Sequence, residues 1–289
     1  MPSKKNKLQL PRTDYVRGRD LLDGKVSGNN IGRYGEIPLI IHQTWKSEMM
    51  KPKLLEWFDG WKEKHPECLH VLWLDEDNER LVKEHFPEFQ TCWDALTLII
   101  QKTDIARLMY LYKYGGVYAD MDYECFMNVF PFLPRQNGFM VVESDMPHNE
   151  VTQNSFMISV PSHPSVMKVL EFIKRLIEEI YVDKTNKMYN LMLNNVFTAP
   201  ILKLYLVTQT TGPSAMDRAL VRTSFDKKEA RPDLSLLNSN LFMKGTVAKH
   251  NYTFSWSSPV YINLVLLIVS IVVVLIVIAV VVTAVCVRR

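Results

Sequence analysis

The chain has 289 residues, a formal net charge of +3 and 47% hydrophobic residues, a composition typical of a globular protein with added apolar content. The near balance of acidic and basic side chains gives no reason to expect a nucleic-acid partner. The 4 cysteines show no spacing typical of a metal site, and they neither require nor exclude an oxidising compartment.

The amino-terminal segment, residues 1–35, has more basic than acidic side chains. Glycine and asparagine recur between positions 23 and 35, which predicts a loop there. We expect residues 1–35 to form a basic, flexible, solvated segment, and contact with anionic lipid is the alternative. The acids Asp14 and Asp20 are outnumbered by the basic residues Lys4, Lys5, Lys7, Arg12, Arg17 and Arg19.

Strands and helices are expected to alternate through residues 36–258, which we interpret as one domain. Short apolar runs predict strands at 37–45, 68–75, 117–123, 138–145 and 154–161. Apolar positions at helical spacing predict helices at 53–66, 76–86, 91–113, 163–180 and 184–217, the last ending in a turn. This order predicts an α/β fold with a mostly parallel central sheet. Ligands bind such sheets at the carboxyl ends of strands, where Trp45, Asp75, Asp120 and Asp122 lie.

Residues 260–287 contain no charged side chain. Because roughly 20 apolar residues span a bilayer as a helix, this run predicts a C-terminal transmembrane helix. A buried core helix is the alternative.

The orientation of this predicted anchor rests on opposing signals. Arg288 and Arg289 favour a cytosolic carboxyl end, and the triplet Asn251-Tyr252-Thr253 fits a luminal glycosylation site. The amino terminus lacks the apolar core of a signal peptide, which favours a cytosolic domain. We expect a single-pass protein of the Golgi or another endomembrane with a luminal catalytic domain.

Two aspartates separated by one residue follow an apolar strand pattern in the string "LYKYGGVYADMDYE". At a strand end, Asp120 and Asp122 can both reach one divalent cation. Such a cation would bind the diphosphate of a nucleotide and neutralise charge on the leaving group. The alternative is a surface loop with two solvated acids.

A second charged pair precedes this motif on the predicted helix. Asp104 and Arg107 are three residues apart and therefore share one helical face. Because that helix is largely apolar and leads into the glycine turn, the pair is expected near Asp120 and Asp122. An exposed ion pair of little energetic value is the alternative.

Five strings occur in a fixed order: "IPLIIHQTWKS", "TDIARLMYLYKYGGVYADMDYE", "NSFMISVPSHP", "TGP" and "HNYTFSW". The long central string is the most specific of them. Together they resemble the DxD-containing glycosyltransferases of family 32 over about residues 37–256. The chain is similar to the fungal inositol phosphorylceramide mannosyltransferases, and more distantly to the initiating Golgi α-1,6-mannosyltransferases.

The resemblance implies a GT-A fold, a nucleotide-sugar donor, a divalent metal (usually Mn²⁺) and retention of anomeric configuration. By position it assigns the metal to Asp120, Asp122 and His250. Asp120 would also contact the ribose or the sugar. It assigns the donor sugar to Asp104 and Arg107.

The same resemblance assigns the nucleotide base to Gln43, Thr44 and Trp45, and the diphosphate region to Trp256. Trp45 as a core residue and His250 as an ordinary satisfied histidine are the alternatives. Asn154 and Ser155 are open between the acceptor side and a strand start. Residues 211–213 are open between a motif and a plain turn.

The function favoured by this resemblance is mannose transfer from GDP-mannose to inositol phosphorylceramide, with a small membrane regulatory subunit as a possible partner. A glycan-directed transferase using GDP-mannose or a UDP-sugar is the alternative within the enzyme class. A non-catalytic membrane adaptor and a tail-anchored cytosolic scaffold are the alternatives outside it. The intact Asp120–Asp122 and Asp104–Arg107 pairs favour an enzyme.

Overall fold

The computed structural model describes residues 8–9, 15–26, 31–134, 138–143, 152–182, 206–220 and 234–253. The chain divides into two compact units. One comprises Met1–Thr185 and Leu206–Tyr252, and the other Asn186–Tyr205 and Thr253–Arg289. Only Thr253 of the second unit is described, so the fold below is that of the first. Within the described ranges, no helix has the length and apolar character needed to span a bilayer. The predicted membrane helix at 260–287 lies outside them.

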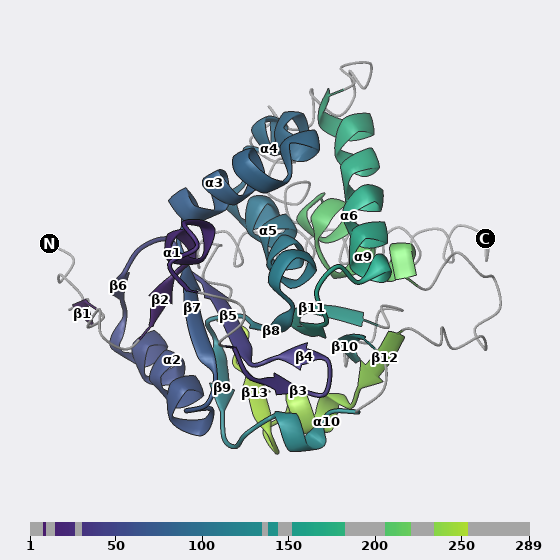
Figure 1. Cartoon of the computed structure of the whole chain (residues 1–289). Helices are drawn as coiled ribbons and strands as arrows, with labels where there is room; N and C mark the ends of the chain where they lie inside the picture. Colours follow the sequence, from purple (N-terminus) through teal and green to yellow (C-terminus); the bar gives the residue numbers. More distant parts are fainter. Residues whose placement is uncertain are drawn as a thin grey trace, which may run out of the picture. The chain divides into compact units, whose positions relative to one another are not determined.

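The centre of the fold is a seven-stranded sheet with the order β12-β10-β11-β8-β5-β7-β2 (Figure 1). Only β11 runs antiparallel to its sheet neighbours, and the other pairings are parallel. The predicted α/β fold with a mostly parallel sheet is therefore confirmed. In sequence order the strands are β2 Val16–Arg17, β5 Ile40–Thr44, β7 Leu69–Trp73, β8 Gly116–Ala119, β10 Phe139–Glu143, β11 Thr152–Ser159 and β12 Leu234–Leu237.

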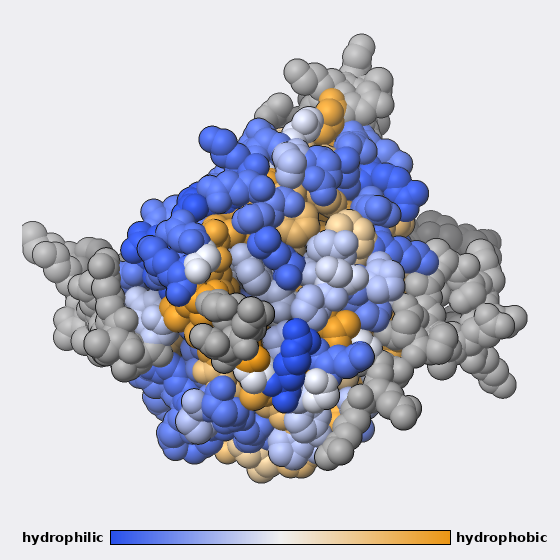
Figure 2. All heavy atoms as spheres, viewed as in Figure 1, coloured by the Kyte–Doolittle hydropathy of each residue, from blue (hydrophilic) through white to orange (hydrophobic). Residues whose placement is uncertain are grey.

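Apolar side chains cover both faces of this sheet. On one face Trp73 of β7 stacks on Tyr110, with ring centroids 4.2 Å apart. On the other face Trp61 stacks on Phe156 of β11. The helices that supply this cover are α2 Pro52–Lys64, α3 Asp75–His85, α5 Ile99–Tyr114, α6 Pro164–Ile177 and α9 Pro213–Leu220. Figure 2 shows hydrophilic side chains on the outer surfaces of α2, α3 and α6.

Smaller elements complete the described unit. Three two-stranded sheets pair β1 Leu8–Gln9 with β6 Met49–Met50, β3 Arg33–Tyr34 with β4 Ile37–Pro38, and β9 Tyr123–Cys125 with β13 Ala248–His250. The short helices are α1 Gly18–Leu22, α4 Gln90–Ala95 and α10 Ser239–Phe242. Single helical turns lie at Pro87–Phe89, Phe130–Phe132, Glu178–Val182 and Val207–Thr211.

The helix expected over residues 91–113 is two helices, so that prediction is wrong in part. α4 ends at Ala95, and Leu96 and Leu98 are extended before α5 begins at Ile99. No glycine or proline marks this break. Leu96 is buried in the same core cluster as Trp93, so burying both side chains outweighs the local helix preference.

The described part of the segment expected to be helical over 184–217 also differs. Residues 184–205 lie outside the described ranges. A single turn, Val207–Thr211, is followed by Gly212, and α9 begins at Pro213. The expected helix-ending turn therefore leads into a new helix, in which proline occupies the first position and needs no hydrogen bond.

The amino-terminal segment is more ordered than expected. β2 adds to the edge of the central sheet, parallel to β7, with Val16 opposite Val71. The expectation of a flexible segment over 1–35 therefore fails for residues 15–26. The pattern that would have revealed this strand is only two residues long, too short to register as a periodic signal.

Candidate active site

The turn between β8 and β9 carries both aspartates of the motif. The strand expected over 117–123 is interrupted here, because Tyr123 N–H donates to the carbonyl of Asp120 (3.0 Å) and closes a turn. Asp120 N–H donates to the Ser155 carbonyl of β11 (2.9 Å). Asn251 N–H donates to the Asp122 carbonyl (3.0 Å). Backbone groups thus fix the turn from two directions.

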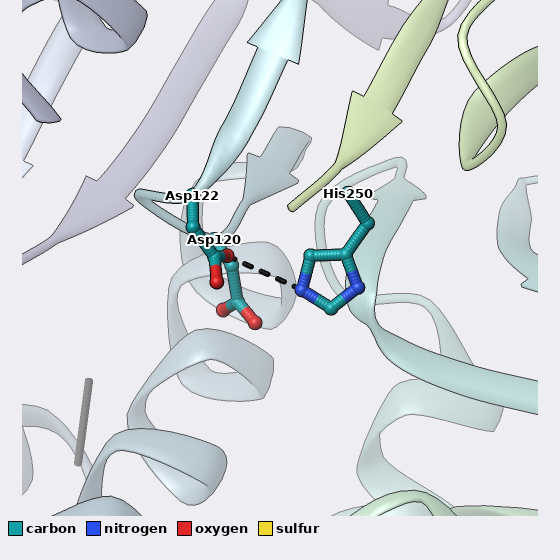
Figure 3. A group of neighbouring side chains, drawn as sticks. All are labelled: Asp120, Asp122 and His250. Atoms are coloured by element: carbon teal, nitrogen blue, oxygen red, sulfur yellow. Dashed lines mark ion pairs between the residues drawn. The ribbon is translucent and has the colours of Figure 1, made fainter. Parts of the chain in front are cut away.

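Asp120, Asp122 and His250 form a cluster at this turn. Their ligand atoms all lie within 4.8 Å of one another. The imidazole points at the two carboxylates, and its Nε2 lies 3.2 Å from Asp122 Oδ1 (Figure 3). β13 pairs with β9 so that His250 is opposite Tyr123, and this register brings a residue 128 positions from Asp122 into the site.

Aromatic rings hold the His250 side chain in place. Its imidazole stacks on Tyr123, with ring centroids 4.7 Å apart and an interplanar angle of 11°. The centroid of the Tyr252 ring lies 4.1 Å from that of the imidazole. Among the described residues, Nδ1 of His250 has no hydrogen-bond partner. Two carboxylates and one imidazole are a donor set that fits a divalent ion such as Mn²⁺. The predicted metal residues therefore lie together.

Arg107 connects the two predicted acidic groups. Its guanidinium lies 3.1 Å from Asp104 Oδ1 and 3.2 Å from Asp120 Oδ1. It also donates to the Asn154 carbonyl (2.9 Å) and lies over the Tyr118 ring. The side chain of Arg107 is only 3% exposed, so its charge acts in a poorly solvated place. The pair thus lies beside Asp120 as expected, and Arg107 forms a buried bridge between α5 and the acidic turn, not the exposed ion pair of the alternative.

Asp104 is held by two side chains whose roles the sequence left open. Asn154 Nδ2 donates to Oδ1 (3.0 Å), and Thr211 Oγ1 donates to Oδ2 (2.8 Å). Burial raises the pKa of Asp104 to about 6, while Arg107 opposes that shift. Thr211 lies in the "TTGP" segment and Asn154 starts the string "NSFMISVP", so order within the five strings was the only available signal. A sugar-binding role for Asp104 and Arg107 stays a prediction.

The carboxylate of Asp120 has protein partners of its own. Tyr118 donates to Oδ1 (2.6 Å), and the side chain remains 26% exposed. Burial raises the pKa of Asp120, Arg107 lowers it, and the neighbouring Asp122 raises it further. A cation at the cluster would favour the charged form of both acids. Binding of a positive ion would therefore stabilise the ionised forms of Asp120 and Asp122.

The predicted base-binding residues end the neighbouring strand β5. Trp45 N–H donates to the Trp73 carbonyl (3.0 Å), and the Trp45 ring is half-buried. Thr44 Oγ1 donates to the same carbonyl and its side chain is buried. β5 and β8 are parallel neighbours, so Trp45 and Asp120 follow strands that end at the same edge of the sheet.

Gln43 and Trp256 are the remaining residues predicted to contact the base and the diphosphate. Gln43 is 1% exposed, and its amide atoms have no hydrogen-bond partner among the described residues. A direct contact with a base would require its cover to move. Trp256 lies outside the described residues.

Residues 52–140 match the family described as "Glycosyltransferase sugar-binding region containing DXD motif". The matched range contains both pairs, Asp104–Arg107 and Asp120–Asp122. Residues 52–140 therefore carry a DXD glycosyltransferase sugar-binding region. The resemblance predicted from the five strings is therefore confirmed.

Several curated proteins that are similar to this chain come from fungi. Over 179 residues the chain is 28% identical to inositol phosphoceramide mannosyltransferase 3 of Schizosaccharomyces pombe, covering 62% of this chain and 48% of that protein. Over 138 residues it is 33% identical to mannosyl phosphorylinositol ceramide synthase SUR1 of Saccharomyces cerevisiae, covering 48% of this chain and 35% of that protein. The chain thus spans less than half the length of these relatives.

Among solved structures, PaToxG glycosyltransferase is similar to 64% of this chain and 69% of its own. The sequence identity is 15% and the TM-score is 0.45.

Proposed function

We propose that this chain is a metal-dependent, retaining glycosyltransferase of the GT-A type. The observation that carries the proposal is the Asp120–Asp122–His250 cluster, joined to Asp104 through buried Arg107. Asp120, Asp122 and His250 would hold Mn²⁺. When bound, the metal would neutralise charge on the diphosphate leaving group.

The chain's own residues prepare the site for that ion. Arg107 and Tyr118 hold one oxygen of Asp120, which fixes the direction of its carboxylate. The stacked ring of Tyr123 and the tilted ring of Tyr252 fix the plane of His250. Because these groups are already oriented, little reorganisation is required when charge develops on the departing diphosphate.

The donor and acceptor follow from the relatives. We propose GDP-mannose as the donor and inositol phosphorylceramide as the acceptor, because the fungal relatives are named for mannose transfer to that lipid. We place the enzyme in the Golgi or another endomembrane. It would be anchored through residues 260–287, with a luminal catalytic domain and a small membrane subunit as a possible partner. Because residues 260–287 follow the domain closely in the sequence, such an anchor would keep the site near lipid headgroups.

The test is metal-dependent hydrolysis of the donor by the full chain purified in detergent. We expect Mn²⁺-dependent release of GDP from GDP-mannose, and no release from UDP-glucose, UDP-galactose or UDP-N-acetylglucosamine. Asp122→Asn should lower the rate by about a hundredfold or more, because a metal ligand loses its charge. Asp94→Asn removes an exposed acid of α4 and should keep full activity.

The other outcomes each decide something. Turnover of a UDP-sugar would retain the transferase and overturn the mannose assignment. Equal activity in chelator, or in Asp122→Asn, would overturn the metal site. Absence of both turnover and donor binding would favour a non-catalytic adaptor.

A further inference from the structure

Arg17 is a buried arginine at the edge of the central sheet, outside the metal cluster. Its side chain is 8% exposed and bonded to three acids from two segments. Nη1 donates to Glu48 Oε1 (2.6 Å), Nε donates to Asp77 Oδ2 (3.2 Å), and Nη2 donates to Glu76 Oε1 (2.8 Å). Charge-assisted bonds of this kind fix geometry more strongly than neutral ones.

The acids that Arg17 binds belong to two connections at the carboxyl edge of the sheet. Glu48 lies three residues after Trp45, in the connection that leaves β5. Asp77 lies in the first turn of α3, the helix that follows β7, and it also accepts from Leu74 N–H (3.0 Å). Arg17 thus ties the segment that carries Trp45 to the start of α3.

The contacts of Arg17 lie close to the segment predicted to bind the nucleotide base. β2 is the edge strand beside β7, and β7 lies beside β5 (Figure 1). Trp45 N–H already bonds the end of β7 through the Trp73 carbonyl. Three residues further along the chain, Arg17 holds Glu48, whose side chain is 12% exposed. The half-buried indole therefore lies between two fixed points.

The acids bonded to Arg17 differ in burial. Glu48 and Asp77 are 12% and 1% exposed, whereas Glu76 is 66% exposed. Burial raises the pKa of Asp77, and the Arg17 charge opposes that shift. A salt bridge to an exposed acid contributes little, whereas a buried one is costly to break. The ion pair between Arg17 and Glu48 is therefore the one that constrains the Trp45 segment.

We propose that Arg17 is a positioning residue for the nucleotide of the donor. Acting through Glu48, it holds the Trp45 segment in the arrangement that accepts the base. The amino-terminal strand is then a working part of the donor site. This inference rests on the proposed glycosyltransferase function and on Trp45 contacting the nucleotide.

The experiment compares Glu48→Ala with Glu76→Ala in the full chain. Both variants remove one carboxylate from the same arginine, but only the first frees the Trp45 segment. Binding of GDP with Mn²⁺ is measured by calorimetry, and KM and kcat for donor hydrolysis are measured separately. Glu48→Ala should weaken GDP binding and raise KM roughly tenfold with kcat nearly unchanged, because one buried charged hydrogen bond is lost.

Further variants separate positioning from folding. Glu76→Ala should match wild type, and Glu48→Gln should recover part of the affinity because its amide oxygen still accepts a bond. The midpoint of thermal unfolding is recorded for each. An equal effect of Glu48→Ala and Glu76→Ala on GDP affinity would overturn the inference, as would a loss in kcat alone.

The same data distinguish failure of this inference from failure of the proposed function. If wild type binds neither GDP nor UDP with Mn²⁺, the transferase proposal is overturned, and this inference with it. If wild type binds and Glu48→Ala binds equally well, only the role of Arg17 is overturned.

Discussion

A few buried charged and polar side chains decide the chemistry of the site. Arg107 lies between Asp104 and Asp120, so two acids share one fixed positive charge. The carboxylate of Asp122 is directed at His250, and its Oδ1 lies 3.2 Å from Nε2. Asp120 therefore lies beside both the fixed charge of Arg107 and the proposed metal site, which Asp122 and His250 complete.

His42 supplies a pH test at the scale of one residue. It is fully buried beneath Gly115, whose carbonyl lies 2.9 Å from Nε2, and Trp73 Nε1 donates to Nδ1. Because Nδ1 accepts, the proton is on Nε2 and the ring is neutral. Burial lowers the pKa of His42 to about 4, from 6.5 in an unfolded chain.

The depressed pKa of His42 makes the free energy of unfolding depend on pH. Between pH 6.5 and pH 4 the unfolded chain binds the proton and the folded chain does not, so the free energy of unfolding falls as the pH falls. This residue alone accounts for a loss of about 3 kcal/mol across that window. We expect His42→Gln to be less stable than wild type at pH 7. Its free energy of unfolding should not show this loss of about 3 kcal/mol, because the titrating imidazole is absent. Urea unfolding at pH 7 and pH 4 should show the gap between the two proteins narrowing, and a constant gap would contradict the assignment.

At the scale of the element, the approach of β8 to the acidic turn depends on glycine. Gly116 has φ of +94°, and a Cβ there would lie 2.5 Å from the Ile40 carbonyl oxygen. The close packing of β8 on β5 therefore excludes any side chain at this position. This pairing determines where the chain emerges at Asp120.

Alanine at Gly116 should destabilise the fold severely. The substitution combines a strained φ with a backbone clash, and we expect a loss of more than about 3 kcal/mol in the free energy of unfolding. Gly24 is the matched control, because its φ is +68° but nothing lies within 4 Å of an added Cβ. Gly24→Ala should cost only about 1 kcal/mol, since strain acts alone. Equal losses in denaturant titrations would show that the clash is relieved elsewhere.

At the scale of the whole molecule, the proposed ligands should stabilise the folded chain together. The cluster places Asp120 and Asp122 close to each other, and a nucleoside diphosphate would add negative charge. Mn²⁺ should offset both, so GDP is expected to bind well only with the metal. Ligand at about a hundred times its Kd adds about 2.7 kcal/mol to the free energy of unfolding.

Thermal unfolding checks this expectation without any turnover. The midpoint should rise with GDP and Mn²⁺ together, and much less with GDP in chelator. Asp122→Asn should abolish the rise, whereas Asp94→Asn should preserve it. A similar rise with GDP in chelator would mean that the nucleotide binds without the cluster.

The sequence alone determined the elements whose signals are local. The strand ending at Trp45, the helix after it and the glycine turn before Asp120 and Asp122 were predicted, because periodicity and glycine act over a few residues. The DXD motif is likewise contiguous. The break in the helix expected over 91–113 was missed, because core packing overrides local preference.

Only the tertiary structure decided the partners. Thr211 reaches Asp104 across 107 positions, and Asn154 reaches it across 50. Arg17 reaches Asp77 across 60 positions, and nothing near Arg17 in the sequence distinguishes it from a solvated arginine of the tail. The physical reason is that hydrogen bonds and ion pairs depend on distance in space, which strand register and helix packing set after the local elements have formed.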